Sequence, residues 1–370
     1  MRTLPVARTV VLAAVAVTVG LVAGCAARPQ PGQQARPAGT ALATVASPPG
    51  ASGVTDRDSI FGMAFNDPSL TFTGGSLYLT WQPTVQPYPP HVTMSRVDPA
   101  TGVIRASNTF SPGILSAPLY AAGSLWMTDA PVSVGGLLLL RLDPRTLMVT
   151  GELSAGVHSL SSTGTGGHVA FAGGSIWVDG GGQLVRVSPR TVTAELTIPQ
   201  PGADSADLAA SPGGDTLIVT SADSGDGVIQ RRDPVTGALL ASHPMLGVVA
   251  PLIGGVSNAG AWVREPTGML GYVERFATRS MTPQNQTRVE GSNGISADVW
   301  DGVLWVRNQA AGPALNYCAD QATGRRLATL PLPDLAQDYV LTVHARTLYY
   351  SAPGGDGFVI RKIPVPAACE

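Results

Sequence analysis

One stretch of the sequence shows most clearly how the chain is built. It is His168–Ile198, HVAFAGGSIWVDGGGQLVRVSPRTVTAELTI. Four short apolar segments lie within it, at His168–Ala172, Ser175–Asp179, Gln183–Val187 and Val192–Ile198. Glycine pairs, a glycine triplet and a Ser-Pro-Arg-Thr sequence separate these segments, and apolar runs with such boundaries are typical of β-strands. The stretch therefore predicts four antiparallel strands joined by tight turns.

The first turn of this unit and the strand after it recur along the chain. A small turn is followed by a short apolar strand with a large residue, usually aromatic, near its start. These marked residues lie 41 to 51 positions apart and are Tyr78, Trp126, Trp177, Ile218, Trp262, Trp305 and Tyr349. Four antiparallel strands in every 40 to 50 residues are typical of a propeller blade. We expect the repeated Trp side chains to pack between blades.

A second phrase, a strand that ends in a turn, follows the first in five units. Proline at the second turn position fixes φ, Asp or Ser before it can bond the backbone that follows, and Gly supplies a positive φ. The five instances are Arg96–Gly102, Arg141–Thr146, Arg186–Thr191, Arg232–Gly237 and Ala319–Gly324. These turns are predicted to join the third and fourth strands of each blade.

The seven units predict an all-β, seven-bladed propeller with four antiparallel strands per blade. The last unit supplies only three strands, at 338–345, 347–351 and 357–363, whereas Ser59–Phe65 has no unit of its own. We expect this N-terminal segment to be the missing outer strand, because ring closure removes exposed sheet edges. The short repeated turns then lie on one face, and the long strand 2–3 and blade-to-blade loops, where binding usually occurs, lie on the other.

Composition excludes several classes of protein. The 370 residues include 44 Gly and 31 Pro and are only 13% charged, which excludes a coiled coil or a helical bundle. The net charge is −2 and no segment concentrates Lys or Arg, so no nucleic-acid partner is expected. Arginine accounts for all but one of the 23 basic residues, which we attribute to codon composition. No P-loop, Rossmann or G-x-S-x-G phrase is present, and no cofactor is expected.

Residues 1–24 have the pattern of a secretory signal, with Arg2 and Arg8 before an apolar run at Val10–Val19. The sequence Leu21–Cys25 that follows resembles the bacterial lipobox. This resemblance implies that Cys25 becomes the acylated N-terminus, carrying palmitate or similar chains, which would anchor the protein to a membrane. The alternatives are an uncleaved single-span anchor and a secreted form cut elsewhere.

The domain boundaries follow from this pattern. Residues 25–56 are rich in Pro, Ala, Gly and Ser and predict a flexible tether, and residues 57–370 form the propeller. The predicted location is the bacterial cell envelope, extracytoplasmic and lipid-anchored, with the choice between inner and outer membrane left open. In an oxidising compartment, Cys318 in the sixth blade and Cys369 in the tail leaving the seventh are candidates for a disulfide, with two free thiols as the alternative.

The GSLW and GSIW phrases with their D-P-x-T-G turns resemble bacterial propellers with YVTN-type, NHL-type and quinoprotein-like repeats, related to WD40 repeats. They also resemble the repeats of virginiamycin B lyase, and the similarity covers about residues 59–366. The lyase resemblance would imply a His base and a metal held partly by Glu. The chain has six Glu and none stands two residues from a His, so no catalytic position is carried over.

Ligand-binding candidates come from outside the repeated phrases. Trp81 and Tyr88 could stack on a ligand. His158 and His168 share one loop and could converge, although solvated loop histidines are the alternative. Asp207, Asp298 and Asp338 lie near three first strands, where a lactonase-like metal ring would need acidic side chains; solvated aspartates are the alternative, and no metal site is predicted.

We therefore predict a non-catalytic module that binds a protein or a small ligand, because convergent ionisable residues are scarce while variable loops are abundant. The first alternative is a metal-dependent enzyme of the lyase or lactonase type with its site at the propeller axis. A second alternative is a protein-assembly scaffold at the cell envelope.

Overall fold

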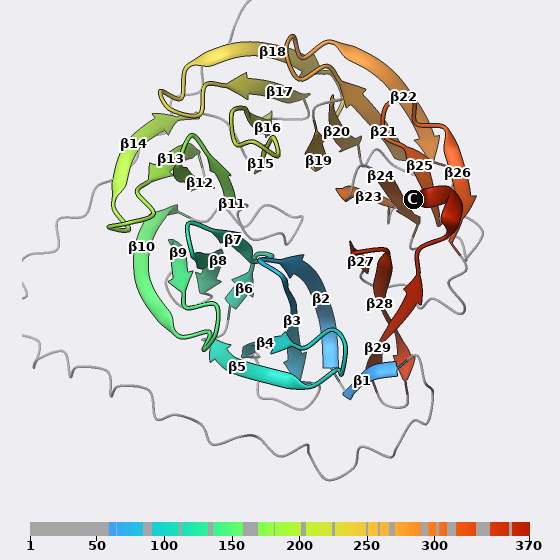
Figure 1. Ribbon diagram of the computed structural model, residues 1–370. Coiled ribbons are helices and arrows are strands. Elements are labelled where there is room, and N and C mark those ends of the chain that lie inside the picture. The colour runs from blue at the N-terminus through green and yellow to red at the C-terminus, as the bar shows by residue number, and fades with distance from the viewer. Residues whose placement is uncertain are drawn as a thin grey trace, which may run out of the picture. The chain divides into compact units, whose positions relative to one another are not determined.

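The computed structural model describes the propeller part of the chain (Figure 1). The described residues are 59–370 except for residues 64, 84–90, 111–112, 132–135, 158–168, 181, 201–204, 224–225, 249–250, 258–259, 266–270, 290–294, 301–302, 309–315, 331–340 and 355–356. The predicted leader, its Cys25 and the predicted tether lie outside the described residues. Within the part that is described, no helix has the length and apolar composition needed to cross a membrane.

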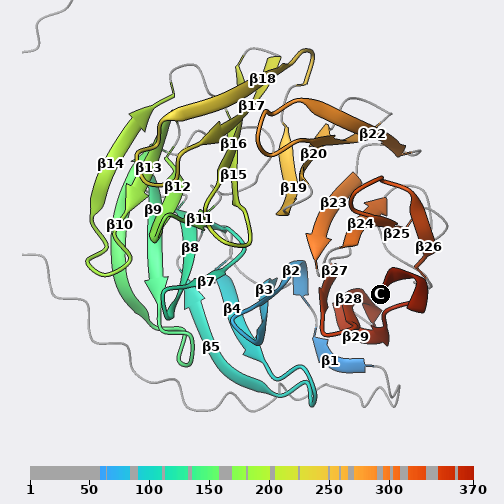
Figure 2. The same ribbon diagram turned by 45° about the horizontal axis from the view of Figure 1, so that its top comes forward.

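Seven antiparallel sheets stand around one axis, with the first strand of each sheet innermost (Figures 1 and 2). Blade 1 comprises β2 (Phe65–Thr73), β3 (Ser76–Pro83), β4 (Val92–Val97) and β5 (Ile104–Phe110). Blade 2 comprises β6 (Gly113–Leu115), β7 (Leu119–Ala121), β8 (Ser124–Pro131), β9 (Gly136–Leu142) and β10 (Val149–Val157). Blade 3 comprises β11 (Val169–Ala172), β12 (Ser175–Asp179), β13 (Gln183–Val187) and β14 (Ala194–Pro199).

The next three blades repeat this order. Blade 4 comprises β15 (Ser205–Ala210), β16 (Leu217–Asp223), β17 (Asp226–Arg232) and β18 (Leu239–Met245). Blade 5 comprises β19 (Leu252–Ser257), β20 (Gly260–Glu265), β21 (Gly271–Phe276) and β22 (Pro283–Val289). Blade 6 comprises β23 (Ile295–Trp300), β24 (Val303–Asn308), β25 (Tyr317–Asp320) and β26 (Arg326–Thr329).

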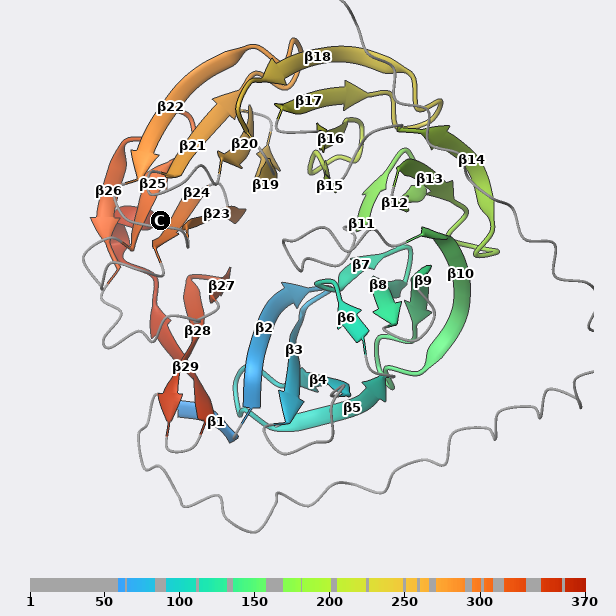
Figure 3. The ribbon, with the colours of Figure 1, turned by 180° about the vertical axis from the view of Figure 1, so that it is seen from behind.

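Blade 7 is built from both ends of the described chain. Its strands are β27 (Leu341–His344), β28 (Thr347–Gly354), β29 (Gly357–Pro364) and, outermost, β1 (Ser59–Met63). Views from the front and from behind both place β1 beside β29 (Figures 1 and 3). The seven-bladed fold and its closure by the N-terminal strand are therefore confirmed.

The boundary between blades 7 and 1 also closes through side chains. The ring of His344, on the inner strand of blade 7, stacks on Phe72 of blade 1 with 3.6 Å between ring centroids. His344 therefore has a packing role at this boundary.

Each blade boundary has its own apolar core. Seven clusters of buried residues form among the described residues, and each joins one blade to the next. Each cluster contains one of the seven marked residues of the repeat, and Trp126, Trp177, Trp262 and Trp305 are almost completely buried. Burial of this kind drives blade stacking, at about 25 cal/mol for each Å² of apolar surface removed from water. The predicted inter-blade role of the tryptophans is confirmed.

The strand 3–4 turns all share one backbone shape. The amide of the last turn residue donates to the carbonyl of the first, as from Gly102 to Asp98, and that last residue has a positive φ. Blade 5 makes the same turn at Ala277–Met281, which the sequence did not reveal because it contains neither Asp-Pro nor Gly. The positive-φ residues of the six turns are Gly102, Leu147, Val192, Gly237, Met281 and Gly324.

These positive-φ residues pack against the preceding blade, and their sizes are matched to it. A Cβ on Gly151 of blade 2 would lie 2.7 Å from the Val192 side chain, so the large residue faces a small one. Conversely, a Cβ on Gly237 would lie 2.2 Å from Cδ1 of Ile198 in blade 3. Large and small residues therefore alternate across the boundaries, as close packing requires.

A cation on the third strand ties several blades to the next one. Arg141 donates to the carbonyls of Pro189 and Arg190 at 3.3 and 3.1 Å, which lie in the strand 3–4 turn of the following blade. The same type of contact joins Arg231 to the Arg279 carbonyl, Arg275 to the Ala322 carbonyl and Lys362 to the Ala100 carbonyl. We call these contacts straps. The Lys362 strap crosses from blade 7 to blade 1 and so helps close the ring.

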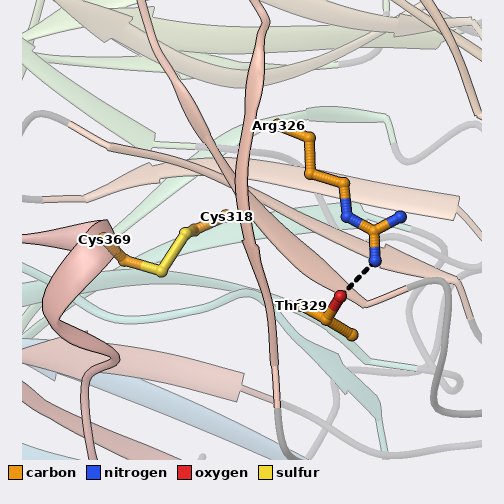
Figure 4. Close-up of a disulfide and its surroundings, with 4 residues drawn as sticks. All are labelled: Cys318, Arg326, Thr329 and Cys369. Atoms are coloured by element: carbon orange, nitrogen blue, oxygen red, sulfur yellow. Dashed lines mark hydrogen bonds between the residues drawn. A yellow bond between two sulfur atoms is a disulfide. The ribbon is translucent and has the colours of Figure 1, made fainter.

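Cys318 on β25 and Cys369 in the C-terminal 3-10 helix η2 (Ala367–Cys369) are joined by a disulfide (Figure 4). Both cysteines are buried. The bond spans 51 positions of sequence, and a loop of that size corresponds to about 4 kcal/mol of stabilisation in the chain-entropy model.

Candidate functional site

The two faces of the ring differ in how their connections are built. The turn face carries the strand 1–2 and strand 3–4 turns, such as Asp98–Gly102. The loop face carries the strand 2–3 loops and the blade-to-blade connections, such as Met245–Leu252. On the turn face, the carboxylates of Asp98, Asp143 and Asp233 accept bonds from the backbone amides of their own turns. These bonds are the main cause of the lowered pKa values of Asp143 and Asp233. The pKa of Asp98 is lowered first by its bond from Arg105 and then by the bonds of its turn. These carboxylates therefore stabilise the turns in which they lie.

The connection from blade 4 to blade 5 presents an apolar side chain on the loop face. Leu246 is 78% exposed, the highest value among the large hydrophobic residues described. Its neighbours Met245 and Val248 are both buried, at 4% exposure, and the Val248 amide donates to the Met245 carbonyl at 3.2 Å. Gly247 has a φ of 74°, as the third position of a tight turn requires. We call Met245–Val248 the Leu246 turn.

Contacts from blade 4 fix the position of this turn. The Gly247 amide donates to Oδ1 of Asp226, the first residue of β17, at 2.9 Å. Thr220 on β16 donates to the Pro251 carbonyl at 2.7 Å, and this bond is buried. A Cβ on Gly227 would lie 3.0 Å from both Pro251 and the Val248 carbonyl, so the connection lies directly on the blade. An exposed leucine is thus held on a turn with little conformational freedom.

Asp207 has a structural task in the same region. Its Oδ2 accepts the Ile253 amide at 2.6 Å and its Oδ1 accepts the Leu208 amide at 2.7 Å. The first bond links the inner strands of blades 4 and 5 and fixes the end of the connection that carries the Leu246 turn. The sequence predicted Asp207 as a ligand-binding residue, and the structure places it, 4% exposed, between two blades.

Asp298, the other predicted acid that the structure describes, does not adjoin Asp207. Asp298 is partly buried on β23, the inner strand of blade 6, and β19 of blade 5 stands between it and β15. Asp338 lies outside the described residues. Within the described ranges, no group of three or more His, Cys, Asp or Glu is arranged to hold a metal.

The remaining predicted binding residues stay predictions. Tyr88, His158 and His168 lie outside the described residues. Trp81 is on β3 next to the strand 2–3 loop of blade 1, and it pairs with Thr93 across the sheet. His91, which follows that loop, is exposed and its Nδ1 lies 3.0 Å from the Phe110 carbonyl.

Asp129 is a buried acid that the sequence did not single out. It lies near the end of β8 towards the loop face and is 5% exposed, and its Oδ1 has no hydrogen-bond partner among the residues that the structure describes. Burial, with a smaller contribution from the charge of Glu152, raises the pKa of Asp129 to about 6. Nothing in its own repeat position marked it, because burial is a property of the folded chain that spacing in the sequence does not show.

The Leu246 turn was also missed by sequence reasoning. Asp226 is one of two acids in the Asp-Ser-Gly-Asp-Gly segment at 223–227, and nothing in the sequence relates it to residue 247. The structure uses that carboxylate to hold the Gly247 amide. Contacts of this kind join strands far apart in sequence and leave no spacing pattern.

Fold and site together define a class: a closed seven-bladed propeller with one face of short hydrogen-bonded turns and, on the other face, an exposed leucine on a fixed turn. No protein-family model matches the chain, and no curated protein matches it. Among solved structures it is similar to BamB from Moraxella catarrhalis, with a TM-score of 0.49 and 13% identity, over 80% of this chain and 84% of that one. Similarity at this level concerns the fold and assigns no function.

Proposed function

We propose that this protein is a lipid-anchored, extracytoplasmic binding propeller that holds a protein partner on its loop face without catalysing a reaction. The observation that carries the proposal is the Leu246 turn, a well-exposed leucine on a connection fixed by Asp226, Thr220 and Asp207.

A fixed turn loses little conformational entropy when a partner binds to it. Ordering a loop on binding costs free energy, and a loop that is already fixed avoids that cost. A protruding apolar side chain gains free energy when it enters a partner's pocket and loses its contact with water. A leucine fixed in this way therefore suits protein recognition, and a partner with an apolar pocket is the occupant that matches it.

The anchoring part of the proposal is supported by sequence. The charged start, the short apolar run and the Cys25 of the lipobox-like segment together suit acylation, and two or three acyl chains hold a protein stably on a bilayer. The predicted tether of about 30 residues would let the propeller reach tens of Å from the bilayer, on a coil estimate of about 5–6 Å × √n.

In-cell photo-cross-linking tests the binding face. A photoreactive amino acid replaces Leu246 in one strain and Thr236, an exposed residue of a turn-face turn, in another. We expect one discrete higher-mass adduct at position 246 and none at 236. Equal adducts at both positions, or none at 246, would contradict the proposal. In a parallel strain, Cys25→Ala should move the protein out of the membrane fraction, and retention there would contradict the anchor.

A further inference from the structure

The third-strand position that carries the straps is fixed by strand register. In every blade it pairs across the sheet with the marked residue of the second strand, as Arg141 pairs with Trp126 and Arg275 with Trp262. Six blades have a cation at this position, namely Arg96, Arg141, Arg186, Arg231, Arg275 and Lys362. Blade 6 differs, because the residue paired with Trp305 is Cys318.

The following blade explains this exception. A strap needs a strand 3–4 turn in the next blade to supply its carbonyl acceptor. Some of the marked side chains also bond to the strand 3–4 turn of the next blade. Trp177 donates to the Pro234 carbonyl at 3.1 Å, and Trp262 donates to the Gln321 carbonyl at 3.0 Å. Blade 7 has no such turn, because its third strand is β29 and its fourth, β1, comes from the other end of the chain. At the boundary from blade 6 to blade 7, an arginine would therefore lack the turn carbonyl that straps elsewhere use.

The C-terminal tail lies where that turn would begin. It leaves β29 at Val365, whose amide donates to the Arg346 carbonyl at 2.9 Å, and helix η2 then contacts β25 and β26 of blade 6. An ion pair of 3.4 Å between Arg346 and Glu370 holds the last residue. The tail does not fill the space completely: a cavity of about 160 Å³ remains, lined by Val303, Trp305, Val343, Arg346, Val365, Cys369 and Glu370.

We propose that the tail, Val365–Glu370, is a latch that takes the place of the missing seventh turn, and that the Cys318–Cys369 disulfide takes the place of the missing strap. A dithiol reductant opens the latch. The disulfide accepts two electrons and two protons and becomes two thiols, while the dithiol becomes a disulfide. The tail then leaves its place against blade 6. Its departure uncovers Trp305 and loosens the boundary between blades 6 and 7. Blade 7 is also the blade that binds the N-terminal strand β1. The other blade boundaries keep their contacts.

Hydrogen exchange followed by mass spectrometry tests this latch on the purified protein, oxidised and after reduction by dithiothreitol, with complete reduction verified by alkylation. We expect amide exchange at residues 365–370 and in β25 and β26 to become at least 10-fold faster. Exchange in blades 2–4 should change less than twofold. No change in the tail, or equal acceleration in all blades, would overturn the proposal.

Variants test whether the disulfide holds the tail. Cys318→Ser with Cys369→Ser removes the disulfide without a reductant, and tail exchange should become as fast as in the reduced protein. Arg346→Met keeps the disulfide and removes the ion pair with Glu370, and its tail exchange should be several-fold slower than in the double-serine variant. Equal exchange in the two variants would overturn the role given to the disulfide. If the variants do not fold, the reduction experiment on the unaltered chain decides the matter.

Discussion

Asp129 has a raised pKa that its neighbours in the sequence do not predict. Its carboxyl group titrates near pH 6 in the folded protein and near 3.8 when exposed, because burial disfavours the charged form. Between these two values the folded state binds one proton more than the unfolded state. This group therefore lowers stability as pH rises from about 4 to 6, and the loss persists above pH 6.

The substitution Asp129→Asn should remove this contribution. We expect a higher free energy of unfolding than wild type at pH 7.5, and a difference that shrinks as pH falls towards 4, measured by urea unfolding. Asp233→Asn is the matched control with the opposite sign, since bonds from its turn lower the pKa of Asp233 and stabilise its charged form. A constant difference between Asp129→Asn and wild type across this pH range would refute the assignment.

Gly237 tests the size matching between blades. Gly237→Ala places a Cβ against Ile198 and Leu196 at a φ of 72°, so we expect a loss of about 2–4 kcal/mol in the free energy of unfolding. Gly75→Ala is the control, because Gly75 has a φ of 73° and no neighbour within 4 Å of its Cβ position. In this control only backbone strain acts, so we expect a loss of about 1 kcal/mol in the free energy of unfolding. Equal losses in urea unfolding would mean that packing adds nothing.

At the scale of elements, the strands were predictable because their signal is local. The four strands of blade 3 were expected within a few residues of β11 to β14, since Gly-Gly and Ser-Pro turns punctuate the sequence there. The turn at Ala277–Met281 escaped prediction because it lacks the Asp-Pro or Ser-Pro pair that marks the turns before Leu147 and Val192, and its positive-φ residue is a buried methionine and not a glycine. Tertiary packing of Met281 between blades stabilises a conformation that the local sequence disfavours.

The straps escaped prediction for a related reason. The cation before each Asp-Pro or Ser-Pro turn was visible in the repeat, but its acceptor lies about 48 residues away, so the arginines were attributed to codon composition. Arg141→Met should therefore lower the free energy of unfolding by about 1 kcal/mol, because it removes bonds to Pro189, Arg190 and Thr150. Arg190→Met changes an exposed side chain of the same boundary and should have little effect. Similar losses in the two variants under thermal unfolding would contradict the strap.

At the scale of the whole molecule, the fold was more predictable than the site. Seven units and one unmatched N-terminal segment were sufficient to predict the closed ring. The Leu246 turn depends on Asp226, Thr220 and Asp207, which come from three different strands, and no spacing in the sequence relates them. Asp207 was a candidate for ligand binding because the sequence shows an acid near a first strand, but the sequence does not show the two backbone amides that donate hydrogen bonds to it.

The assignment of two faces, the straps and the latch all depend on both ends of the described part of the chain meeting in blade 7. Gly62 of β1 lies opposite Val359 of β29, so Gly62→Cys with Val359→Cys should form a disulfide, identified by peptide mapping without reduction. Met63→Cys with Val359→Cys is the control, since a shift of one residue points the two introduced side chains to opposite sides of the sheet. The closed ring predicts a cross-link in the first pair and little in the second. No cross-link at 62 and 359, or equal cross-linking in both pairs, would contradict it.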